Sequence, residues 1–266
     1  MSSFLSLGSP GRAPESDSIV SFDGTRIHFD LHDSPSRALV LIVPGFWRNR
    51  SHPAMLRLAN LLGESGYRAA VMDVRGHGES GGTYGFNLHE HYDVAAVVKH
   101  LAATFSFESV TLLGLSYGGA IAVSAAARHE LPLSSLLLIS PVADPAMIAP
   151  RLNPFLIHRH IAFGQALRRP RFDWRTQRTA RLRAVDDIHN IHVPICMIHV
   201  KDDWLITHRH SLLLHEAANL PKELHILDVA GNYHSDRIFT IAPDTIEPIV
   251  RRFLDRYTPV TSDANE

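Results

Sequence analysis

The 266-residue sequence contains a single cysteine, Cys196, and lacks long hydrophobic runs. One cysteine excludes an internal disulfide framework, and its apolar neighbours indicate a buried strand residue. The longest apolar clusters, such as residues 136–139, fall far short of the roughly 20 residues that a transmembrane helix needs. The amino terminus has no basic start followed by an apolar run, so it does not match a secretory signal. We therefore expect a cytoplasmic protein without an integral membrane segment.

Neither sign of charge is in excess, because the formal net charge at pH 7 is −1. This balance gives no overall attraction to nucleic acid or acidic membranes, and we expect no nucleic-acid partner. The 18 histidines include no H-E-x-x-H motif and no Cys/His cluster at metal-ligand spacing. We therefore expect no metal and no cofactor. The sequence leaves the oligomeric state open.

What the sequence does contain is a regular alternation of strand and helix patterns. Continuous apolar runs are typical of strands buried on both faces of a parallel sheet, and segments with apolar residues at helical spacing separate them. The predicted strands occupy residues 38–43, 69–74, 110–113, 136–139, 195–200 and 223–229. A β-hairpin around Asp23-Gly24 precedes them. The pattern predicts an α/β fold with a doubly wound, mostly parallel sheet, whose reactive groups lie at the carboxyl ends of the strands.

Residues 145–190 interrupt the alternation because they contain no buried-strand pattern. We predict that they form a short helical cap over the carboxyl edge of the sheet. The remaining predicted parts are a core at residues 18–144 and 191–258 and flexible tails at residues 1–17 and 259–266.

The predicted cap is rich in arginine. Nine arginines and one acid, Asp173, lie between Arg151 and Arg183. On a helix, Arg171, Arg175 and Arg178 would share one face. The arginines form either a solvated helix face or a surface that attracts an anionic part of a substrate.

One stretch combines a strand pattern, a sharp turn and a helix pattern. After the apolar residues 110–113, Gly114, Ser116 and Gly118 make the pattern G-x-S-x-G. A serine at the tip of such a turn takes a strained backbone conformation, which requires glycine two positions to either side. Ser116 is therefore a candidate nucleophile. The amide of Tyr117, at the positive end of the following helix, can bind an oxyanion beside it.

A serine nucleophile needs a base, and the base needs an acid that holds its tautomer. After a G-x-S-x-G motif, the acid and then the histidine follow along the chain. Asp203 comes at the end of a predicted strand, and His234 comes in the loop after the last strand. Ser116, Asp203 and His234 are therefore the predicted catalytic residues.

With these motifs the chain resembles an α/β-hydrolase over about residues 18–258, and the resemblance implies the α/β-hydrolase fold. His234 matches the late G-x-x-H pattern of the family, here Gly-Asn-Tyr-His. Asp203 matches the strand-end acid, although valine replaces the glycine usual three positions before it. Asp144 is the alternative acid, because some members carry the acid after the preceding strand.

Two further segments resemble the family. Residues 73–80 match its D-x-R-G-x-G-x-S signature, and the resemblance implies structural roles for them, His77 included. Residues 44–46, Pro-Gly-Phe, stand where the family commonly has H-G-x, so the second oxyanion donor would be the amide of Phe46. Phe46 and Tyr117 are also expected to line the acyl pocket. The candidate substrate-binding residues are Trp47 and Arg175.

The resemblance implies a serine hydrolase that cleaves a carboxylic ester or thioester through an acyl-enzyme on Ser116. Chains with this pairing of motifs resemble esterases and monoacylglycerol lipases, and the arginine-rich cap favours a thioester with a phosphopantetheine-linked leaving group. A peptidase, carbon–carbon hydrolase or lyase would use the same triad. A small-molecule-binding protein with little turnover, or one that associates with membrane surfaces through its arginines, is a further alternative.

Overall fold

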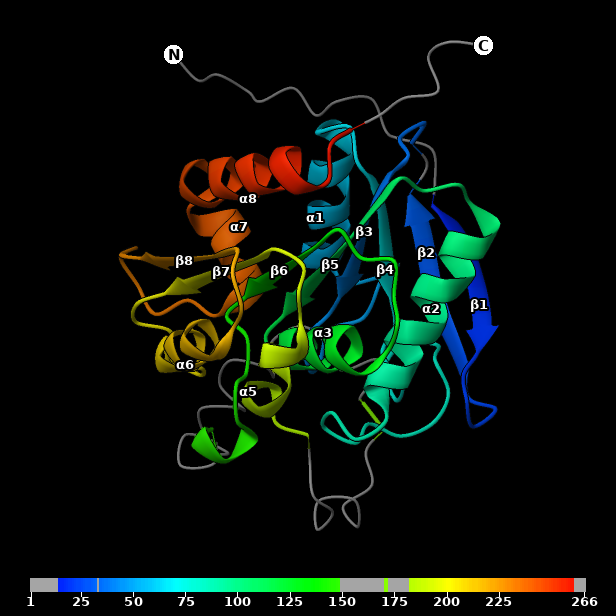
Figure 1. The fold of residues 1–266 in the computed structure, drawn as a ribbon, viewed down its shortest axis with the longest axis horizontal. Coiled ribbons are helices and arrows are strands. Elements are labelled where there is room, and N and C mark those ends of the chain that lie inside the picture. Colours follow the sequence, from blue (N-terminus) through cyan, green and yellow to red (C-terminus); the bar gives the residue numbers. More distant parts are fainter. Residues whose placement is uncertain (1–13, 33, 149–169, 172–181, 261–266) are drawn as a thin grey trace.

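The computed structural model describes residues 14–32, 34–148, 170–171 and 182–260. In these ranges, eight strands form one sheet in the order β1-β2-β4-β3-β5-β6-β7-β8 (Figure 1). Neighbouring strands from β4 to β8 are parallel, and β2 is antiparallel to both β1 and β4. The strands are β1 (Glu15–Val20), β2 (Arg26–His32), β3 (Ala38–Val43), β4 (Arg68–Met72), β5 (Ser109–Leu115), β6 (Ser135–Ile139), β7 (Ile195–Val200) and β8 (Lys222–Leu227). The predicted doubly wound, mostly parallel α/β fold is confirmed.

Helices cover both faces of the sheet (Figure 1). One face carries α1 (Pro53–Glu64), α7 (Ile238–Ile241) and α8 (Pro243–Tyr257). The other face carries α2 (Glu90–Thr104), α3 (Tyr117–Arg128), α5 (Ala184–Asp187) and α6 (Arg209–Ala217). Within the described ranges, no helix combines the length and hydropathy needed to cross a bilayer.

Two hydrophobic cores lie between the sheet and its helices, one on each face. Leu39 and Leu41 of β3 pack in the core with α2 and α3, whereas Val40 and Ile42 pack in the core with α1 and α8. Successive strand residues point to opposite faces, so a strand buried on both faces must be apolar throughout. This explains the continuous apolar runs of the central strands.

The β1–β2 hairpin is present, and it starts earlier than the predicted core. β1 begins at Glu15, which pairs with Leu31 of β2. Residues 15–17 were predicted as flexible tail because their side chains are polar, and the structure shows these side chains exposed. Their backbone is ordered by ladder hydrogen bonds, which do not require apolar side chains.

The predicted cap is described at its two ends and at residues 170–171. Arg175 lies outside the described residues. Arg171 is not helical: its amide donates to the carbonyl of Gly76 at 2.8 Å, and its carbonyl accepts from the amide of Tyr84 at 2.8 Å. The helix face predicted for Arg171 is therefore wrong, because its backbone pairs with the loop after β4. Arg183 forms an ion pair with Asp144 at 2.9 Å.

Candidate active site

The turn between β5 and α3 holds Ser116 in a strained conformation. Ser116 has φ 56° and ψ −121°, and its amide donates to the last carbonyl of β6 at 2.9 Å. A positive φ is uncommon for a residue with a side chain. A Cβ on Gly114 would lie 2.6 Å from the Cα of Gly119, and a Cβ on Gly118 would overlap the backbone at the end of β3. Close approach thus explains both glycines of the motif.

Ser116, His234 and Asp203 form a continuous chain of hydrogen bonds. The Nε2 atom of His234 lies 2.8 Å from Oγ of Ser116, and Nδ1 lies 2.7 Å from Oδ2 of Asp203. The three residues follow β5, β7 and β8, so the parallel sheet brings their side chains together at its carboxyl edge. Asp144 does not join this chain and instead pairs with Arg183. The arrangement can activate a hydroxyl as a nucleophile.

The carboxylate of Asp203 is fully buried and well satisfied. Its Oδ1 accepts hydrogen bonds from the amides of Leu205 and Ile206, both at 2.9 Å. Burial on its own would raise the pKa of this carboxyl group. Electrostatic attraction to His234 and hydrogen bonds from His199 and His234 outweigh burial and hold the pKa of Asp203 well below its usual value. Asp203 therefore stays ionised and can hold the imidazole in one tautomer.

The turn that follows β3 packs directly on the nucleophile. A Cβ on Gly45 would lie 3.0 Å from the Cβ of Ser116, so a side chain has no room there. Trp47, two residues later, has φ 69°, and its amide donates to Nε2 of His77 at 3.2 Å. The ring of Phe46 packs edge-on against His77, with centroids 5.6 Å apart. His77 thus contacts the two residues that follow Gly45.

Comparison with known proteins identifies the family of the chain. A family model described as serine aminopeptidase, S33, matches residues 34–180, more than half of the chain. The chain belongs to this family of α/β-hydrolases.

Other α/β-hydrolases match this chain more distantly. The lysophosphatidylserine lipase ABHD12 of Macaca fascicularis is 24% identical over 238 residues, which cover 84% of this chain and 57% of that protein. The AB hydrolase superfamily protein YisY of Bacillus subtilis (strain 168) is 38% identical over 88 residues, 32% of this chain and 31% of that protein. The chain therefore spans less than two thirds of the length of these curated relatives. The esterase Pf2001 of Pyrococcus furiosus shares the fold, with a TM-score of 0.75 and 19% identity over 92% of this chain and 93% of that chain.

In this α/β-hydrolase, the D-x-R-G-H-G-x-S segment is held by buried charges. Asp73 accepts hydrogen bonds from the amide and guanidinium of Arg50. Arg75 forms a two-pronged ion pair with the fully buried Asp93, at 2.6 and 2.7 Å. Buried charges are tolerated when they are paired in this way. The segment is thereby fixed next to the turn after β3.

His77, in the same segment, is buried and neutral. Its Nε2 accepts the hydrogen bond from Trp47, so Nδ1 carries the proton and donates to the carbonyl of Arg75 at 3.2 Å. Burial, with the nearby positive charge of Arg171, lowers the pKa of His77 to about 4. The imidazole is therefore a permanent acceptor for the Trp47 amide at neutral pH.

An aromatic cluster borders the nucleophile and consists of Phe46, Tyr84, Phe86 and Tyr117. Phe46 stacks on Tyr84 with centroids 5.1 Å apart, and Phe86 packs edge-on against Tyr117 at 5.5 Å. Tyr117 is buried, whereas Phe46 and Trp47 are partly exposed. The two partly exposed aromatic residues follow Gly45, whose backbone packs on Ser116.

The sequence did not single out His199, which supports the acid. It lies in β7, four residues before Asp203, and is buried. Its Nδ1 lies 2.7 Å from Oγ of Ser211, and its Nε2 lies 2.8 Å from the carbonyl of Ile206. These contacts fix the turn that carries Asp203. The sequence does contain one indication of this role, because His199 is a polar residue inside a strand that is predicted to be buried on both faces.

Proposed function

We propose that this chain is a serine hydrolase that cleaves carboxylic esters, with Ser116 as nucleophile, His234 as general base and Asp203 as the acid. The observation that carries the proposal is the hydrogen-bonded chain from Ser116 through His234 to Asp203, at 2.8 and 2.7 Å. The strained turn at Ser116 supports it, because such a turn exposes a serine at the edge of the sheet.

The reaction runs through an acyl-enzyme. His234 takes the proton from Ser116 as Oγ attacks the ester carbonyl carbon, and it returns this proton to the leaving alkoxide as the carbon–oxygen bond breaks. Water then attacks the acyl group, with His234 again as base. Ionised Asp203 stabilises the imidazolium that forms in both steps.

The amides of Phe46 and Tyr117 are the proposed oxyanion donors. Gly45 packs on Ser116 and brings the Phe46 amide near it, and Tyr117 opens the 12-residue helix α3. Each such donor contributes on the order of 3 kcal/mol to transition-state stabilisation. Trp47 and the aromatic cluster are the proposed wall for an apolar acyl group. Arg175, in the predicted cap, is proposed to bind an anionic part of the substrate.

Labelling with a fluorophosphonate probe tests the nucleophile. We expect covalent modification of the wild-type protein at Ser116 and none of the Ser116→Ala variant. Ser65→Ala is a matched control, because Ser65 caps the end of α1 away from the triad, and this variant should label like wild type. Folded wild-type protein that does not react would favour a binding protein with little turnover.

A substrate panel tests the ester preference. We expect p-nitrophenyl esters of graded chain length to be cleaved faster than acyl-CoA thioesters and amino-acid p-nitroanilides. The p-nitroanilides test for aminopeptidase activity, the activity named in the description of the matching family. Lysophosphatidylserine is a further substrate for the panel, because the relative ABHD12 is named a lysophosphatidylserine lipase. Faster cleavage of anilides or thioesters would replace the ester proposal with a peptidase or a thioesterase.

A further inference from the structure

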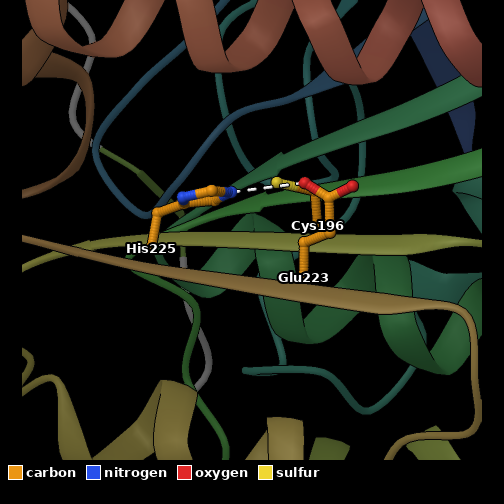
Figure 2. Close-up of side chains that lie close together, drawn as sticks. All are labelled: Cys196, Glu223 and His225. Atoms are coloured by element: carbon orange, nitrogen blue, oxygen red, sulfur yellow. Dashed lines mark hydrogen bonds and ion pairs between the residues drawn. The ribbon is translucent and has the colours of Figure 1, made fainter.

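Three metal-ligating side chains lie close together far along the sheet from Ser116. Cys196 comes from β7, and Glu223 and His225 come from the neighbouring edge strand β8 (Figure 2). Their sulfur, carboxylate and imidazole atoms all lie within 4.8 Å of one another. Nε2 of His225 is 3.3 Å from Oε2 of Glu223.

The register of the sheet creates this cluster. Cys196 pairs with Glu223, and His225 is two residues further along β8. Residues directly opposite in neighbouring strands, and residues two apart in one strand, point to the same face. All three side chains therefore project on the face that α8 covers, as Figure 2 shows. In the sequence, Glu223 and His225 come 27 and 29 positions after Cys196, so no ligand spacing is visible there.

From this geometry we infer that Cys196, Glu223 and His225 bind a zinc ion. Thiolate, imidazole and carboxylate are the ligand types that zinc uses, whereas magnesium and calcium take oxygen ligands. Bonds of about 2.0–2.3 Å place the donor atoms of a tetrahedral site roughly 3.5 Å apart. The donor atoms here all lie within 4.8 Å of one another, with His225 and Glu223 at 3.3 Å. The fourth position is open to water, because the side chains of Glu223 and His225 are 29% and 25% exposed.

The charges in the site balance on binding. Zinc binds the thiolate form of cysteine, so Cys196 must lose its proton when the metal binds. Zinc displaces that proton to solvent, and the thiolate and Glu223 then neutralise the two charges of the ion.

The position of the site gives it a structural role. β7 leads to Asp203, and β8, the edge strand, leads to His234. A zinc ion on Cys196, Glu223 and His225 would join these two strands near their amino ends. It would therefore hold the edge strand against the rest of the sheet without contacting the nucleophile.

Binding of the metal alone tests the site. We expect the wild-type protein, stripped with chelator, to bind one equivalent of zinc with a rise in Tm, and to show a thiolate-to-cobalt charge-transfer band with Co²⁺. Cys196→Ala and His225→Ala should each weaken zinc binding at least about tenfold and abolish the rise in Tm. Cys196→Ala should also lose the band.

Two controls make the result unambiguous. His189→Ala removes an exposed histidine that is not in the cluster, and Ser116→Ala removes the proposed nucleophile; both should bind zinc like wild type. Circular dichroism confirms that each variant is folded, and His225→Ala keeps the test valid if Cys196→Ala does not fold. No charge-transfer band in the wild type, or equal zinc affinity in wild type and His225→Ala, would overturn the inference. Neither readout depends on hydrolase activity.

Discussion

The two candidate acids differ in what surrounds their carboxylates. Asp203 is buried, accepts two backbone amides and faces His234, whereas Asp144 pairs with Arg183. The sequence places both at strand ends and favours Asp203, with Asp144 as the alternative acid, but chain order alone does not decide between them. That decision depends on which strand end lies beside the loop of His234, and this is a property of the sheet order.

Replacing each acid separately separates the candidates. We expect Asp203→Asn to lower kcat on the order of 10⁴-fold, because the amide neither stabilises the imidazolium nor holds the tautomer of His234. Asp144→Asn is the matched control and should keep a kcat close to wild type. Turnover of a p-nitrophenyl ester measures both. A large loss in Asp144→Asn with a small one in Asp203→Asn would reverse the assignment.

The turn after β3 depends on a second segment of the chain for its shape. Trp47 has a positive φ, which costs energy in a bulky residue unless its surroundings hold it. His77 provides this support by accepting the Trp47 amide and packing on Phe46. The proposed oxyanion donor at Phe46 is therefore positioned through His77.

Loss of this support should lower turnover more than substrate affinity. We expect His77→Ala to reduce kcat about tenfold or more, with a smaller change in KM, since loss of a whole oxyanion donor costs about 10²–10³. His77→Gln, whose amide oxygen can accept the Trp47 hydrogen bond, should recover part of kcat. His89→Ala, at an exposed histidine, is the control for the histidine change. A loss confined to KM would contradict a positioning role.

Most strands could be predicted from their apolar patterns. The exact ends of some strands, and the side-chain contacts between strands, could not. The strands at 38–43 and 195–200 have the predicted bounds, because a continuous buried run marks each of them. β1 was missed at its start because backbone pairing leaves no apolar pattern. His199 and the Cys196 cluster were missed because each depends on contacts that only the folded sheet creates.

At the scale of the whole molecule, buried and half-buried histidines make stability depend on pH. Burial lowers the pKa values of His52, His77 and His91 to about 4, aided by nearby positive charges at Arg48, Arg171 and His129. An unfolded histidine titrates near 6.5. As the pH falls from 6.5 to 4, the unfolded chain binds protons that the folded chain does not. The three neutral histidines therefore stabilise the folded state fully above pH 6.5, and this stabilisation is lost as the pH falls from 6.5 to 4.

Unfolding by urea at several pH values measures this effect. We expect the free energy of unfolding to fall between pH 6.5 and 4, with His77 alone contributing up to about 1.4 kcal/mol per pH unit. His77→Gln removes one titrating group and should flatten the profile. A His77→Gln profile as steep as that of wild type would show that His77 does not contribute.

The sheet order also determines when the proposed catalytic residues can come together. Ser116 follows a central strand, but His234 follows β8, which lies at the edge and late in the chain. In a nascent chain whose β8 has not yet joined the sheet, Ser116 would lack its proposed base. Such a chain would therefore be inactive during synthesis. The edge strand β8 pairs with a neighbouring strand on one side only. If β8 detached locally, His234 would move away from Ser116 and activity would be lost while the central strands remained folded.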